Sequence, residues 1–273
     1  MVNHYCKTRD AIMNNDEAIR HRFSESADLY AKSGVHADPE DLRRMTDAAR
    51  LTGSERVLDL GTGTAHAALA FAPQVAEVVG LDLTQDMLLE GAKLARERGI
   101  ENLELRLGNA EAIPFDDESF DLVIARQCPH HFANVALAVD EASRVLRVGG
   151  QLLILDSISL PNPKLDTFMN SVEILRDPSH VRNYNMVEWR RFFESAGLEV
   201  DLQKDWLLRL EFADWIRRGG TSPTAVAQLR AMLTGAHSEL RSAYEIDVIR
   251  CDFGLPVGIT RGTKKSPRIA TAG

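Results

Sequence analysis

The sequence has 273 residues, of which 44% are hydrophobic and 26% are charged, and its formal net charge at pH 7 is −8. This length fits one globular domain with an elaboration, and the acidic balance argues against a broad nucleic-acid-binding surface. No apolar run reaches the roughly 18 residues that cross a bilayer, and the polar N-terminus has no signal-peptide core, so we expect a cytoplasmic protein without a membrane span.

The first fifty residues precede the main pattern of the chain. Residues 1–15 lack periodicity and are predicted to be flexible. A polar helix is predicted over 14–31, where one helical stripe carries Ile19, Phe23, Ala27 and Tyr30. A second helix is predicted from Asp41 to Leu51, ending before Gly53.

From residue 53 the pattern becomes a repeated alternation of strands and helices, which predicts a mainly parallel sheet covered on both faces. Strands are predicted at 56–60, 76–82, 102–107, 120–125, 150–156 and 198–208. Helices are predicted at 64–72, 85–98, 135–147 and 187–196. The run from Phe120 to Ala125 lacks strict alternation, as expected of a central strand that is buried on both sides.

The chain breaks at Pro161-Asn162-Pro163, after the fifth predicted strand. The stretch that follows, as far as Asn185, is expected to be a helix-bearing insertion over the active site. Further helices are predicted at 211–218 and 225–234.

The last predicted strand, 255–260, contains two residues that weaken a sheet. Pro256 cannot donate a backbone hydrogen bond, and Gly258 has no side chain to pack. Both residues suit only an edge strand or a bulge. The polar segment 261–273 is predicted to be a disordered tail.

The most specific motif follows the first predicted strand, whose apolar residues contain Asp59 and lead into Gly61-Thr62-Gly63. Glycines let the backbone turn sharply and let a ligand approach the main chain closely. Asp82 ends the second predicted strand, where a carboxylate can accept hydrogen bonds from both hydroxyls of a ribose. Together these features predict a site for a nucleoside-containing cofactor.

Two residues favour S-adenosylmethionine over NAD. His66 stands where a dinucleotide-binding turn has its third glycine. Asp59 would add negative charge beside a pyrophosphate, whereas it suits the ammonium group of a cationic ligand. An NAD-dependent dehydrogenase is therefore disfavoured.

At these positions the chain resembles the class I S-adenosylmethionine-dependent methyltransferases, within them the small-molecule group that includes the menaquinone and ubiquinone methyltransferases. The resemblance runs from about Phe23 to Leu207 and covers 57–65, 78–82 with Met87, 108–115, 119–132 and 141–150. It implies an α/β fold with a doubly wound, mainly parallel, seven-stranded Rossmann-like sheet. It further implies a helical lid at 16–52, a cofactor-binding core at 53–160, and a substrate-side insertion with the C-terminal strands at 161–260.

The resemblance implies that S-adenosyl-L-methionine is the cofactor. It assigns the methionine part to Asp59, Gly61, Thr62 and Gly63, the ribose to Asp82, and the adenine face to Leu83 and Met87. Other readings stay open, because Asp59 could cap the next helix, Asp82 could be a turn residue and Met87 could belong to the core.

Three further residues complete the expected cofactor site. Asn109 stands where relatives usually have an aspartate that receives the adenine amino group, and its amide oxygen can still accept that bond. Ala110 is expected to contact adenine through its backbone amide. Arg126 is expected to contact the carboxylate of the cofactor or an anionic acceptor, or else to face solvent.

Methyl transfer needs a base only when the acceptor still carries its proton. His131 and His130 are the candidate catalytic residues, although the pair could instead cap a helix or pack against the cofactor. Asp156, Ser157 and His180 are further candidates.

Cys6, Cys128 and Cys251 have neither paired nor metal-type spacing, so we expect reduced thiols and no metal site. Cys128 is expected to line the pocket rather than to act as a nucleophile.

The sequence thus predicts transfer of a methyl group to O, N or C of a small cyclic or aromatic metabolite. Tyr30, the insertion and residues beyond 205 are expected to build the acceptor pocket, and Trp206, Phe212 and Trp215 either wall it or belong to the core. One alternative is an enzyme of the same fold with another activity, such as a cyclisation. A non-catalytic protein that binds S-adenosylmethionine is the other.

Overall fold

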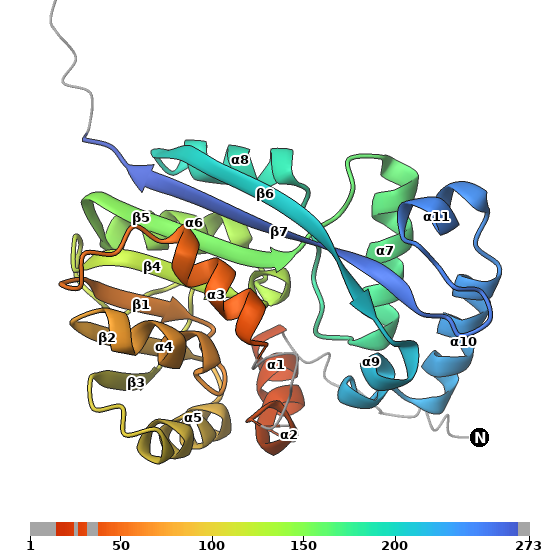
Figure 1. Cartoon of the computed structure of the whole chain (residues 1–273), viewed down its shortest axis with the longest axis horizontal. Helices are drawn as coiled ribbons and strands as arrows, with labels where there is room; N and C mark the ends of the chain where they lie inside the picture. The colour runs from red at the N-terminus through yellow and green to blue at the C-terminus, as the bar shows by residue number, and fades with distance from the viewer. Residues whose placement is uncertain (1–14, 25–26, 32–37, 267–273) are drawn as a thin grey trace, which may run out of the picture.

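The computed structural model describes residues 15–24, 27–31 and 38–266, and its centre is a seven-stranded sheet in the order β3-β2-β1-β4-β5-β7-β6 (Figure 1). The strands are β1 (Arg56–Leu60), β2 (Glu77–Asp82), β3 (Leu103–Leu107), β4 (Phe120–Arg126), β5 (Leu146–Ser157), β6 (Leu198–Leu210) and β7 (Phe253–Lys264). The first five strands pair in parallel, whereas β7 runs antiparallel to β5 and β6. The predicted α/β fold, with its mainly parallel seven-stranded sheet, is confirmed.

Apolar cores lie on both faces of the sheet, as β4 shows most clearly. Val123 packs into one core, while Leu122 and Ile124 pack into the other. A strand that is buried on both sides must be apolar throughout, which explains the unbroken apolar run. The helices that carry these cores are α3 (Pro39–Ala48), α4 (His66–Phe71), α5 (Gln85–Glu97), α6 (Val135–Val145) and α8 (Met186–Ser195), with short 3-10 turns η1 (Ala72–Gln74) and η2 (Pro129–His131).

A second group of helices, here called the helical lobe, lies beyond the end of β5. It consists of α7 (Pro163–Arg176), α9 (Phe212–Arg218), α10 (Pro223–Thr234) and α11 (Ser238–Ala243). Figure 1 shows β6 and β7 extending past β5 to reach this lobe. A third apolar core joins the lobe to the strands, and in it the Tyr244 hydroxyl donates to the Leu165 carbonyl at 2.8 Å.

Two short helices, α1 (Asn15–Ser24) and α2 (Ala27–Ala31), stand where a single helix was predicted. Figure 1 shows them between the sheet and the helical lobe. The Asn15 side chain donates to the His131 carbonyl at 2.9 Å, and Arg22 donates to the carbonyl of Gly219 in the lobe. The two helices therefore contact both halves of the molecule. The predicted flexible segment 1–15 lies outside the described residues except for Asn15.

The prediction that the last strand lies at an edge or forms a bulge was wrong, because β7 lies between β5 and β6. Pro256 is tolerated because it comes one residue past the last β5 pair, and its carbonyl accepts the Ile158 N–H at 2.8 Å. Gly258 is required by close packing, since a Cβ there would lie 2.6 Å from the sulfur of Met186. The predicted tail began too early, because β7 continues to Lys264, and 267–273 lie outside the described residues.

Among the described residues, no helix is both long enough and apolar enough to cross a membrane.

Candidate functional site

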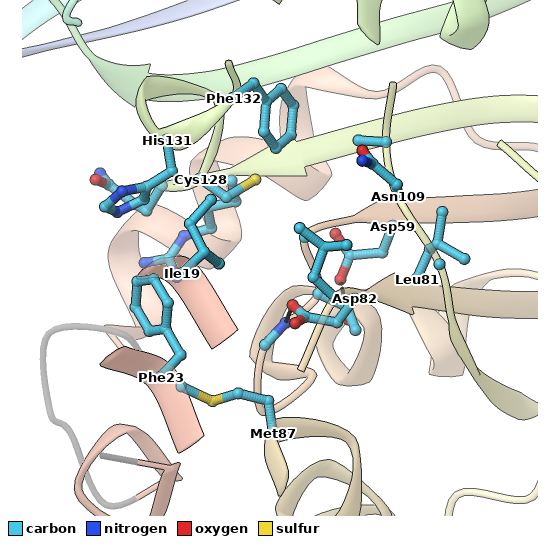
Figure 2. A pocket seen from close by; sticks show the side chains of 18 of the residues that line it. Ile19, Phe23, Asp59, Leu81, Asp82, Met87, Asn109, Cys128, His131 and Phe132 are labelled. Carbon is cyan, nitrogen blue, oxygen red and sulfur yellow. Dashed lines mark hydrogen bonds between the residues drawn. The ribbon is translucent and has the colours of Figure 1, made fainter. Parts of the chain in front are cut away.

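A cavity of about 970 Å³, counting the part that is open to solvent, lies at the carboxyl ends of β1, β2 and β4. In Figure 2, Ile19 and Phe23 of α1 lie across this first cavity from Asp59 and Asp82. Every predicted cofactor-binding residue lines it: Asp59, Gly61, Thr62, Gly63, Asp82, Leu83, Met87, Asn109, Ala110 and Arg126. Strand ends at a reversal of strand order thus bring together residues from four separate segments.

The two glycines of the turn after β1 serve different purposes. Gly61 has φ of +60°, and a Cβ there would lie 2.7 Å from the Cys128 sulfur. Gly63 has φ of +54°, but a Cβ there would meet nothing within 4 Å. Gly61 is thus required by packing within the protein, whereas Gly63 leaves space that a ligand can use.

Asp59 is 1% exposed and is held by the turn that follows it. Its Oδ2 accepts hydrogen bonds from the Thr62 hydroxyl at 2.6 Å and from the Ala68 amide at 3.1 Å. The bond to Ala68, in the first turn of α4, agrees with the alternative that Asp59 caps this helix, and the predicted ligand contact stays a prediction. Burial raises the pKa of Asp59 to about 7 despite these hydrogen bonds. A nearby cation would stabilise the charged form.

Asp82 is fixed by two backbone amides. Oδ2 accepts from the Gly63 N–H and Oδ1 from the Thr84 N–H, both at 2.8 Å. Burial raises the pKa of this carboxyl as well. Because each carboxylate oxygen has two lone pairs, both can still receive a ribose hydroxyl.

On the adenine side, the Asn109 amide is already engaged with neighbouring residues. Its oxygen accepts the Glu111 N–H at 2.8 Å, and its nitrogen donates to Asp16 at 3.2 Å. One lone pair of the oxygen remains for a ligand. Met87 lines the cavity from α5 and is 2% exposed, so its predicted roles as core and lining residue coexist.

The first cavity is acidic. Its described lining includes the carboxyl groups of Asp16, Asp59, Asp82 and Glu111, beside the guanidinium of Arg126. Such a lining favours a cationic ligand over a dianionic one. Arg126 is buried against α3, with its Nη2 at 3.8 Å from Oδ2 of Asp41.

A second cavity, of about 660 Å³, adjoins the first and shares Phe23, Tyr30, Arg126, Gln127 and His131 with it. The other lining residues include Asp41, Ser157, Leu208, Leu210, Leu255 and Arg218, with Glu173, Arg176, Trp215 and His130. Sequence reasoning missed Glu173, Arg176 and Arg218, because no motif marks them. The sequence did place an insertion after β5 over the active site, which indicated the segment that contains Glu173 and Arg176 but not these residues themselves.

His130 lines the second cavity and is held by a buried acid at the end of β5. Its Nδ1 lies 2.6 Å from Oδ1 of Asp156, and its backbone N–H donates to Oδ2 at 2.8 Å. Burial opposes protonation of the ring, yet the charge and hydrogen bond of Asp156 outweigh it and raise the pKa of His130. Nε2 makes no hydrogen bond to the described residues, so it is available to a ligand in the cavity.

The other two histidines differ from His130. His131 lines both cavities, its Nδ1 lies 3.0 Å from the Ser179 carbonyl, and burial with the neighbouring His130 lowers its pKa to about 3. His180 lies behind them, bonded to the Asn170 amide at 3.2 Å, and burial lowers its pKa strongly. Within the described residues neither ring is hydrogen-bonded to a carboxylate, and the charge of Asp177, which favours protonation of both rings, does not outweigh burial.

Cys128 and the three aromatic residues expected near the acceptor lie in different surroundings. The Cys128 thiol donates to the Leu60 carbonyl at 3.1 Å, and burial raises its pKa well above the ordinary value, so it lines the first cavity without being activated. Trp215 lines the second cavity. Phe212 belongs to the core of the lobe, and Trp206 packs under the Arg44 guanidinium at 4.5 Å. Of the three aromatic residues, Trp215 therefore lines the second cavity, whereas Trp206 and Phe212 do not.

A mainly parallel sheet with an antiparallel β7, and a glycine turn between the acids Asp59 and Asp82, define a class of α/β enzymes that bind a cationic nucleoside cofactor. A family model described as a methyltransferase domain matches residues 58–154.

The uncharacterized methyltransferase YcgJ of Bacillus subtilis (strain 168) is 40% identical over 223 residues, which are 81% of this chain and 88% of that protein. The crystal structure of YcgJ matches with a TM-score of 0.80 at 36% identity, covering 84% of this chain and 99% of that one. A ubiquinone/menaquinone biosynthesis C-methyltransferase, UbiE of Dinoroseobacter shibae, is 38% identical over 136 residues, 48% of this chain and 53% of UbiE. The chain belongs to the class I S-adenosylmethionine-dependent methyltransferases.

Proposed function

We propose that this methyltransferase transfers the methyl group to O, N or C of a small acceptor with a cyclic or aromatic body, bound in the second cavity. The observation that carries the proposal is His130, which lines the second cavity, next to the first, and is hydrogen-bonded to Asp156 at 2.6 Å. The likeness to UbiE, whose name gives quinone biosynthesis, supports a cyclic acceptor.

The cofactor is assigned to the first cavity. Asp59 would face the ammonium group, Asp82 would receive the ribose hydroxyls, and Arg126 would meet the carboxylate. The adenine would lie against Leu83, Met87, Asn109 and Ala110. The acidic lining and the open space beside Gly63 fit a cationic nucleoside.

S-adenosylmethionine, when bound, supplies a methyl carbon activated by a sulfonium, so positioning and exclusion of water are the main tasks of the protein. Ile19 and Phe23 of α1 line the first cavity opposite the acids. In this proposal α1 and α2 form the lid, because their apolar side chains cover the cavity once the ligands are in place.

His130 is proposed as the general base. Its Nε2 takes a proton from a hydroxyl, amine or activated carbon of the acceptor while Asp156 holds Nδ1. His131 is proposed as a lining residue at the junction of the two cavities, since its ring nitrogen faces the Ser179 carbonyl and its pKa is about 3.

Calorimetry with S-adenosylmethionine, S-adenosylhomocysteine and NAD tests the cofactor assignment, and absence of binding by the first two would refute it. Turnover with a labelled methyl group over a panel of phenols, quinones and heterocycles then tests the acceptor class. Tight cofactor binding with no transfer to any member of the panel would favour the alternative of a different activity on the same fold.

A further inference from the structure

We propose that Arg176 binds an anionic group, a carboxylate or a phosphate, on the methyl acceptor. The inference rests on the proposed function, because it takes the second cavity as the acceptor site. It adds an anionic group to the cyclic or aromatic acceptor that is proposed above.

Arg176 places a nearly buried positive charge at the wall of the second cavity. It ends α7, lines the second cavity, and its side chain is 12% exposed. Within the described part of the chain, its guanidinium donates no hydrogen bond. The nearest acidic oxygen, Oδ2 of Asp177, lies 3.9 Å from Nη1, which is beyond hydrogen-bonding distance. A guanidinium this deeply buried normally donates hydrogen bonds to acceptors, so a ligand in the cavity is suited to supply them.

The Arg176 guanidinium packs closely against two parts of the α9 region. Its Cζ lies 5.4 Å from the centroid of the Trp215 ring in α9. Gly219, which follows α9, allows the backbone to approach the other edge, since a Cβ there would lie 2.5 Å from Nε. Such packing limits the movement of the guanidinium, whose planar fork binds carboxylate and phosphate oxygens in pairs.

The remaining charged groups around the second cavity leave it cationic. Arg126 lies 3.8 Å from Asp41, and Arg218 donates to Asp214 at 2.7 Å from the outer side of α9. Glu173, one turn before Arg176, is 5% exposed, and its side-chain Oε1 has no hydrogen-bond partner among the described residues. Burial raises its pKa, which favours the neutral carboxyl group. A neutral Glu173 can share an anion with Arg176 rather than repel it.

Apolar side chains form the rest of the wall. Leu208, Leu210 and Leu255 come from β6 and β7, and Trp215 lies beneath Arg176. This distribution fits a molecule whose apolar ring packs on the strands while its anionic head reaches α7. The reacting atom would then lie toward His130, which lines the same cavity.

Calorimetry on the protein saturated with S-adenosylhomocysteine tests the proposal. The probes are phenylacetate, phenyl phosphate and the neutral phenylacetamide. We expect at least one anion to bind about tenfold more tightly than phenylacetamide, as a charge-assisted paired contact provides. The carboxylate and phosphate probes, compared with each other, show which oxyanion the cavity prefers.

Arg176→Gln should abolish the preference for the anion, and Arg176→Lys, which keeps the charge without the fork, should reduce it. Arg217→Gln is the matched control, because Arg217 is on α9 with a side chain that is 70% exposed and does not line the cavity. That variant should keep the full preference.

The outcomes separate the two proposals. If neither anion binds, if phenylacetamide binds as tightly as both anions, or if the Arg176 variants keep the wild-type preference, the anionic acceptor is refuted and methyl transfer is untouched. If the wild-type protein binds no S-adenosylhomocysteine, the proposed function fails instead. The affinity for S-adenosylhomocysteine of each variant also reports whether it is folded.

Discussion

The first and second cavities share a wall at Phe23, Tyr30 and His131, yet they are built in different ways. The first is acidic, and its acids come from α1 and from short segments at the carboxyl ends of strands. The second has arginines from the helical lobe and apolar residues from β6 and β7. The lining of the first cavity is therefore largely local to the sheet, whereas the lining of the second cavity depends on how the lobe packs against the sheet. Variants that affect one cavity and spare the other test this division.

The largest effect is expected for His130→Gln. Loss of a general base should lower the turnover number by about 10²–10⁴-fold while cofactor affinity stays unchanged. Because Asp156 raises the pKa of His130, wild-type turnover should increase with pH through a value above 6.5, and the variant should lose that rise. His237→Gln, at an exposed position before α11, is the control. Equal turnover of wild type and His130→Gln would remove His130 from the mechanism.

Asp82→Ala should affect the first cavity alone. It removes a carboxylate that the Gly63 and Thr84 amides hold in place, so we expect cofactor affinity to fall about 100-fold by calorimetry. Asp86→Ala, an exposed acid in the first turn of α5, should keep wild-type affinity. An Asp82→Ala protein that binds within threefold of wild type would contradict the ribose assignment.

The two glycines of the turn provide a comparison within the first cavity. Gly61→Ala should lower the free energy of unfolding by about 2–3 kcal/mol, because a positive φ and the contact with Cys128 both disfavour a Cβ. Gly63→Ala should lower it by only about 1 kcal/mol, since its Cβ would meet no protein atom. Urea denaturation measures both. Equal losses of unfolding free energy in the two variants would show that backbone strain, and not the contact with Cys128, determines the effect.

The smallest effect concerns Asp59, whose pKa is about 7. As its charged fraction increases, affinity for S-adenosylmethionine should rise about tenfold between pH 6 and pH 8. Asp59→Asn should bind with little pH dependence. Without ligand the sign reverses for folding: the folded-state pKa lies above the ordinary 3.8, so burial of this group costs stability as pH rises from about 4 to about 7. A pH-independent wild-type affinity would argue against a charged contact.

The sequence predicted those parts of the molecule whose causes are local. The turn at Gly61 and the acid at Asp82 follow strands, so pattern and position suffice to place them at one edge of the sheet. The contact between His130 and Asp156 joins the ends of two neighbouring strands, and only their pairing reveals it.

Two features lay beyond sequence reasoning for a different reason. The position of Pro256 was misinterpreted because a proline argues against a central strand only where that strand pairs on both sides. At Pro256, β7 pairs with β6 alone, since the pairing with β5 ends at Val257. Arg176 looks like any arginine at the end of a helix. Among the described residues its guanidinium donates no hydrogen bond, and its neighbours Trp215 and Gly219 reach it only through the tertiary fold.

The position of β7 also constrains the order in which the protein is assembled during synthesis. A ribosome releases β6 before β7, yet β6 joins the sheet only through β7. Until Phe253 and the residues after it emerge, β5 has an open edge, and β6 lacks its partner for backbone hydrogen bonds. The nascent chain can therefore form the lining of the first cavity before β7 is made, whereas the second cavity, which Leu255 lines, is complete only after β7 has paired with β5 and β6.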